Sequence, residues 1–152
     1  NAALAAETGL RFTTLEEVLT ESDVLSLHVP LTPQTRHLVN AAALARMKPT
    51  AMLINTGRGA LVDTRALIDA LKAKRIGAAG LDVYEEEEGV FFHDLSEQGL
   101  QDDTLVRLLT FPNVLITSHQ GFLTHEALTN IAETTLGSIT AFARGEPLRH
   151  AL

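Results

Sequence analysis

The chain has 152 residues, of which 45% are hydrophobic and 20% charged, and its formal net charge is −7. This composition is typical of one soluble, cytoplasmic globular domain; no cysteine is present to form disulfides or thiolate metal sites. An acidic chain without a lysine and arginine cluster or an apolar run of ~18 residues is not expected to bind nucleic acid or span a membrane.

Short apolar runs alternate with amphipathic segments, a pattern typical of βα units that feed a parallel sheet. The chain opens on an alanine-rich stretch that resembles the middle of a helix, so we expect a piece of a longer protein. Strands are predicted at 24–27, 51–54, 77–83 and 114–117. Because these runs are continuous in apolar residues, we expect the strands to be buried on both faces.

Capping residues mark the helices between these strands. Thr14 with Glu17 fits a capping box, and either Asp102 or Asp103 begins a helix through residue 109. Further helices are predicted at 41–47, capped by Asn40, at 64–74, capped by Asp63, and at 124–143. The irregular interval 85–110 is long for a compact domain, which favours a functional role.

Ligands of open α/β sheets bind at the carboxyl ends of the strands, so the residues that follow each apolar run are candidates for a site. Arg58 has a planar fork that matches a carboxylate, although a surface arginine is the alternative. His119 alone is more typical of a core histidine. Pairing with Glu87 would make it a general acid, and the sequence does not establish that pairing. Asp82 is either a cap or a contact for a bound ring.

The remaining polar residues carry weaker signals. Glu85, Glu86 and Glu88 are more typical of solvated charges than of ligands. Four other histidines have no metal-ligand spacing among them, so we predict no metal site and treat all four as surface or structural residues: His37, His93, His125 and His150.

Four blocks in order resemble the D-2-hydroxyacid dehydrogenases. They are LTPQT at 31–35, INTGRG at 54–59, GLDVYE at 80–85 and FPNVLITSH at 111–119. Within that family, EGVFFHD at 88–94 and SHQGFLT at 118–124 resemble the fermentative D-lactate dehydrogenases.

The resemblance implies the C-terminal half of a Rossmann-like, doubly wound parallel sheet. Residues 1–122 would form a partial dinucleotide-binding domain, because the family's G-x-G-x-x-G phosphate-binding turn does not occur in these residues. Residues 123–152 would form a C-terminal helix that returns to a missing substrate domain. Its apolar side chains Leu128, Ile131, Leu136 and Ile139 would then be exposed.

The resemblance also implies an activity, the reduction of a small 2-oxo acid by NADH, with pyruvate and D-lactate favoured. Arg58 would hold the substrate carboxylate, His119 would donate the proton, Glu87 would orient that histidine and Phe122 would lie against the substrate. The implied NAD contacts are Val29, Pro30, Thr35, Thr56, Gly57, Arg58 and Asp82. Relatives are commonly homo-oligomers, so a homo-oligomer is expected.

Other functions remain open from the sequence. The parent protein is alternatively another D-2-hydroxyacid dehydrogenase or an NAD-sensing interaction module. These 152 residues alone are expected to be inactive, or to be a folded remnant that does not bind the cofactor.

Overall fold

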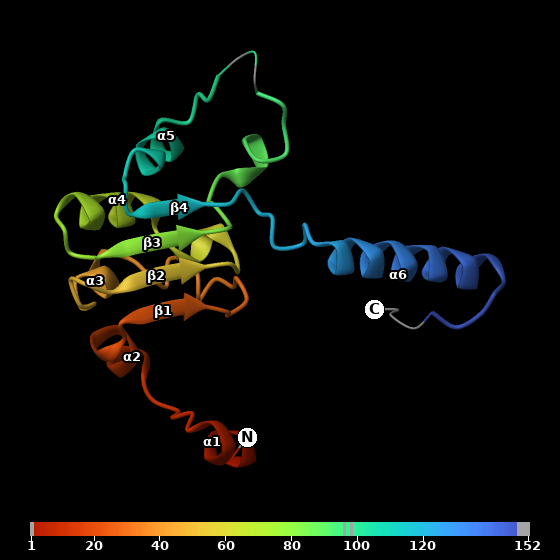
Figure 1. Cartoon of the computed structure of the whole chain (residues 1–152), viewed down its shortest axis with the longest axis horizontal. Coiled ribbons are helices and arrows are strands. Elements are labelled where there is room, and N and C mark those ends of the chain that lie inside the picture. The colour runs from red at the N-terminus through yellow and green to blue at the C-terminus, as the bar shows by residue number, and fades with distance from the viewer. Residues whose placement is uncertain (1, 96, 98, 149–152) are drawn as a thin grey trace. The chain divides into compact units, whose positions relative to one another are not determined.

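In the computed structural model, which describes residues 2–95, 97 and 99–148, helices pack against a parallel sheet (Figure 1). The strands lie in the order β1 (Val24–Leu27), β2 (Met52–Asn55), β3 (Ala78–Leu81) and β4 (Val114–Ile116). The α-helices are α1 (Ala2–Thr8), α2 (Leu15–Glu21), α3 (Ala41–Leu44), α4 (Thr64–Lys72), α5 (Asp103–Leu109) and α6 (His125–Ala143). Two 3₁₀ turns, η1 (Gly59–Leu61) and η2 (Glu87–Gly89), follow β2 and β3. The predicted α/β class and parallel sheet are confirmed.

The chain divides into two compact units, residues 1–119 and residues 120–152. The second unit consists mainly of α6, which has no buried residues. Its apolar side chains at 128, 131, 136 and 139 are exposed, as the sequence predicts. Residues 149–152 of the expected C-terminal segment lie outside the described residues. Across the described part of the chain, no helix combines the length and the apolar character that a membrane crossing requires.

Side-chain caps begin most of the helices where the sequence predicts them. The Thr14 hydroxyl accepts a hydrogen bond from the Glu17 amide at 3.2 Å, whereas the Glu17 carboxylate accepts from the Thr13 hydroxyl instead of closing a reciprocal box. Of the two candidate caps for α5, Asp102 is the one used, because its Oδ1 accepts from the amides of residues 104 and 105. Helix α3 ends at Leu44, earlier than predicted, because the amides of Arg46 and Met47 bond to carbonyls only three residues back.

Burial alternates along the strands, so the expectation that both faces are buried is wrong for this chain. Leu25, Leu53 and Leu81 point into the core, whereas Val24 and Leu115 are 60% and 66% exposed. The buried face packs in one cluster with side chains of the helices, among them Leu44, Leu67 and Leu108. Helices α2 to α5 therefore cover one face of the sheet, and the continuous apolar runs do not distinguish one covered face from two.

All the strand pairs are parallel, with Leu27 opposite Asn55 and Asn55 opposite Leu81. The segments that follow the strands consequently leave the sheet at the same edge. This register places the segments after residues 27, 55, 81 and 116 together.

Asn55 ends β2 and is 1% exposed. Its Nδ2 donates to the Arg58 carbonyl at 2.9 Å, and its Oδ1 accepts from the Gly57 amide at 3.1 Å. We expect Asn55→Ala to lower the free energy of unfolding by about 1–3 kcal/mol, because both backbone groups lose a buried partner. Urea denaturation measures this change. Asn113→Ala is the control, since this exposed side chain makes one bond, to the Gly77 carbonyl, and an equal loss in both variants would contradict the prediction.

Tyr84 is buried, and its hydroxyl donates to Asp102 Oδ2 at 2.7 Å. Burial, followed by the Asp102 carboxylate, raises the pKa of Tyr84 well above its ordinary value of 10.0. Above about pH 10 the unfolded chain loses this proton before the folded chain does, so stability falls as pH rises. We expect Tyr84→Phe to lose about 1 kcal/mol at neutral pH. It should also show a shallower decline between about pH 9 and about pH 11.

Unfolding free energies measured by urea denaturation across that pH range test this expectation. Parallel declines in the wild type and the phenylalanine variant would contradict it.

Candidate active site

The structure brings Glu87 and His119 together at the carboxyl edge of the sheet. Glu87 Oε1 lies 2.9 Å from His119 Nδ1, with the two side chains 15% and 32% exposed. Glu87 Oε2 accepts from the Tyr84 amide at 3.0 Å, which fixes the carboxylate from its other side. When Nδ1 carries its proton toward Glu87, Nε2 is the ring nitrogen that remains for a substrate. The pair is thus arranged for proton transfer.

The backbone that carries His119 is unusual. Ser118 and His119 both have φ of 56°, in the left-handed region that non-glycine residues seldom adopt. Each such residue costs on the order of 1 kcal/mol or more, unless its surroundings hold it. The His119 amide donates to the Asp82 carbonyl at 2.5 Å, and the Thr117 hydroxyl donates to the Asp82 carboxylate. These bonds join the segment after β4 to the segment after β3.

Arg58 lies in the loop after β2, and its side chain is exposed. Its Nη1 donates to the Gly57 carbonyl at 2.8 Å, so the guanidinium lies over its own loop. Gly59, the next residue, packs tightly against the backbone that leads to Glu87: a Cβ at this position would lie 2.1 Å from the Tyr84 carbonyl carbon. The loop that carries Arg58 therefore abuts the loop that carries Glu87.

The residues predicted to contact NAD lie on three segments at the same edge. Val29 and Pro30 are exposed after β1, and Thr56 is exposed after β2, beside Gly57. The Thr35 hydroxyl donates to the Pro30 carbonyl at 2.7 Å and lies 2.8 Å from the Thr32 amide, so it holds the turn that follows β1. Asp82 follows β3, and its amide donates to the Asn55 carbonyl at 2.9 Å.

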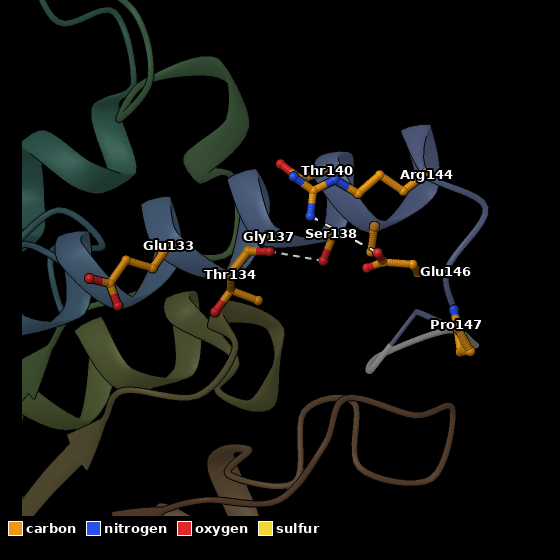
Figure 2. A pocket seen from close by; sticks show the side chains of 9 residues that line it. Glu133, Thr134, Gly137, Ser138, Thr140, Arg144, Glu146 and Pro147 are labelled. Atoms are coloured by element: carbon orange, nitrogen blue, oxygen red, sulfur yellow. Dashed lines mark hydrogen bonds and ion pairs between the residues drawn. The ribbon is translucent and has the colours of Figure 1, made fainter.

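The predicted substrate contact Phe122 belongs to the second unit, where it is 47% exposed, and its role stays a prediction. The second unit has a hollow of about 570 Å³ beside the C-terminal half of α6 (Figure 2). Arg144 and Glu146, an ion pair at 4.0 Å, both line the hollow, whereas none of the predicted site residues does.

Several residues of the site escaped the sequence analysis. The Phe92 ring lies against the His119 ring, with their centroids 5.9 Å apart. Asn55 shapes the Arg58 loop, and the Tyr84 amide holds Glu87. An asparagine that directly follows an apolar run is a sequence signal that could have identified Asn55. The paired aromatics at 91 and 92 are a weaker sequence signal for Phe92. The role of the Tyr84 amide leaves no signal in the sequence, because every residue other than proline has a backbone amide.

Glu85, predicted to be a solvated charge, has a side chain only 15% exposed. Its carboxylate lies 2.6 Å from His37 Nε2, because the turn after β1 passes beside the segment after β3. His37 is therefore a structural residue, one of the two roles predicted for it.

Known proteins match this chain over its whole length. The family model described as the NAD-binding domain of D-isomer-specific 2-hydroxyacid dehydrogenases matches residues 1–121. A 2-hydroxyacid dehydrogenase homolog of Zymomonas mobilis is 50% identical over 98% of this chain and 45% of its own length. The D-lactate dehydrogenase of Escherichia coli is 50% identical over 95% of this chain and 44% of its own length.

Among solved structures, a D-lactate dehydrogenase from a Sporolactobacillus species superposes with a TM-score of 0.91 at 42% identity, covering 100% of this chain and 45% of that one. The chain thus spans less than half the length of the relatives it matches. The chain belongs to the NAD-binding domain family of the D-isomer-specific 2-hydroxyacid dehydrogenases.

Proposed function

We propose that the whole protein containing this chain reduces pyruvate to D-lactate with NADH. The observation that carries the proposal is the Glu87–His119 pair, which lies on the same sheet edge as the Arg58 loop. The E. coli and Sporolactobacillus relatives, both D-lactate dehydrogenases, support the choice of substrate.

Substrate binding in this proposal depends on Arg58. A 2-oxo acid carries a carboxylate next to its carbonyl, and a guanidinium offers two parallel N–H donors to such an anion. The exposed Arg58 side chain is accessible to a ligand, and its guanidinium donates to the adjacent Gly57 carbonyl. Exchanging that bond for a substrate carboxylate leaves the Asn55 contact to the Arg58 backbone in place. The same cation stabilises negative charge on the carbonyl oxygen as the reaction proceeds.

The proton in this proposal comes from His119. A hydride adds to the carbonyl carbon while His119 Nε2 gives its proton to the carbonyl oxygen, which leaves a 2-hydroxy acid and a neutral imidazole. Glu87 holds Nδ1–H and stabilises the imidazolium before transfer. Phe92, whose ring lies tilted beside the imidazole, limits the positions that the imidazole can adopt. In the lactate-oxidising direction, the same imidazole accepts the proton.

The residues of this chain that would bind the nicotinamide end of NAD have side chains suited to that role. When bound, NADH supplies the hydride for this reaction. The exposed Thr56 and the Asp82 carboxylate follow neighbouring strands, where a nicotinamide ring and its ribose offer hydrogen-bonding groups. We propose that Val29, Pro30, Thr35 and Gly57 contact the remainder of the cofactor.

The test compares NADH oxidation with pyruvate in the whole wild-type protein and in two variants. We expect His119→Gln to lower kcat by roughly 10²- to 10⁴-fold, because the proton donor is lost. Arg58→Gln should lower kcat/KM by about 10²-fold or more, because charge stabilisation and carboxylate binding are both lost.

His93→Gln and Arg65→Gln are the matched controls, since both positions are exposed and neither is assigned to the site. Wild-type protein that reduces no small 2-oxo acid, or site variants that behave like these controls, would refute the proposal. Activity confined to aromatic or larger 2-oxo acids would assign a different D-2-hydroxyacid dehydrogenase. Capture of a partner that depends on NADH but not on His119 would favour the NAD-sensing module.

A further inference from the structure

A second histidine–glutamate pair lies at the same sheet edge as Glu87 and His119 but has no part in the proposed chemistry. Glu85 Oε1 lies 2.6 Å from His37 Nε2 and 3.1 Å from Arg36 Nη2. Glu85 Oε2 accepts from the Thr64 hydroxyl at 3.3 Å. Thr64 is 7% exposed, and Arg36 is 56% exposed, so the contacts to His37 and Thr64 are the less hydrated ones. We call these four residues the Glu85 cluster.

The Glu85 cluster is attached to the loop that carries Arg58. The His37 amide donates to the Ala60 carbonyl at 2.8 Å, two residues after Arg58. The following residues continue this contact through a parallel bridge between Val39 and Val62. His37 holds φ of 52°, a conformation that is costly for a histidine unless contacts on both its backbone and its ring maintain it.

The cluster is also attached to the loop that carries Glu87. Glu85 lies two residues before Glu87, and η2, the 3₁₀ turn that begins at Glu87, has no side-chain cap of its own. The Gly59 backbone packs against the Tyr84–Glu85 peptide so closely that a Cβ there would be 2.5 Å from the Glu85 nitrogen. The Tyr84 amide in turn holds the Glu87 carboxylate. Glu85 therefore sits where the Arg58 loop and the Glu87 loop meet.

From this arrangement we infer that Glu85, held by His37 and Thr64, is a positioning residue that fixes the substrate-binding loop relative to the proton-donating pair. The inference rests on the proposed function. Glu85 touches neither substrate nor cofactor in this role. It acts by holding constant the distance between the Arg58 loop and the Glu87–His119 pair. This distance matters because misplacing reacting groups by about 1 Å lowers the rate on the order of 100-fold.

The experiment uses the whole protein with three variants. Glu85→Ala removes every contact of the carboxylate. Glu85→Gln keeps the shape, with an amide oxygen that accepts from His37 and an amide nitrogen that donates to the Thr64 oxygen. Glu86→Gln is the matched control, because it removes the same charge from an exposed neighbour that makes no capping bond.

For Glu85→Ala we expect kcat per folded molecule to fall roughly 10- to 100-fold with an unchanged KM for NADH. Deuterated NADH should show a larger isotope effect on kcat, because hydride transfer becomes slower relative to product release. Glu85→Gln should restore kcat and the isotope effect toward the wild-type values. Alanine and glutamine variants that both match Glu86→Gln, or an activity loss that only follows the folded fraction, would overturn the inference.

Amide hydrogen exchange separates this inference from the proposed function. Glu85→Ala should accelerate exchange at the amides of residues 37, 84 and 119, while Glu86→Gln should not. If the wild type reduces no 2-oxo acid, the proposed function fails, and this comparison still decides whether Glu85 couples the loops. Unchanged exchange at residues 37 and 119 would overturn the coupling.

Discussion

The parallel register of the sheet is the constraint on which the rest of the structure depends. Because each strand pairs with the next in the same direction, residues that are about 30 positions apart in the chain emerge side by side at one edge. Arg58, Glu87 and His119 follow three different strands, yet Glu87 and His119 come within hydrogen-bond distance. A shift of one residue in one strand would move its following segment by about 3.3 Å and exchange its buried and exposed side chains.

Backbone contacts at this edge hold conformations that isolated peptides would avoid. His37, Ser118 and His119 all have positive φ, and two of these three donate an amide hydrogen to a carbonyl of a neighbouring loop. The cost of these conformations, on the order of 1 kcal/mol or more each, is offset by hydrogen bonds and packing in the first unit. The site is thus pre-organised: the segment after β4 bonds to the segment after β3, and Gly59 brings the segment after β2 against that same segment.

The two units of the chain are stabilised differently. The first has a hydrophobic cluster in which side chains of β1, β2 and β3 meet those of helices α2 to α5. Burial of this apolar area stabilises the unit by roughly 25 cal/mol per Å² removed from water. In the second, α6 relies on its Thr124 cap and its internal hydrogen bonds, with Leu136 and Phe142 exposed. Local signals therefore suffice to define α6 as a helix, whereas the strands depend on contacts between distant segments.

Local patterns in the sequence determined the elements of this protein. The apolar runs located the strands, and Thr14, Asn40 and Asp63 located helix starts, because capping depends on residues within one turn. Because ligands of parallel α/β sheets bind at the carboxyl ends of the strands, the sequence also indicated the candidate residues of the site. Tertiary structure alone decided which of them meet: the Glu87–His119 distance, the burial of Glu85 against His37, and the position of Phe92 beside the imidazole. These contacts join residues 32, 48 and 27 positions apart, and local patterns carry no information about distances across such separations.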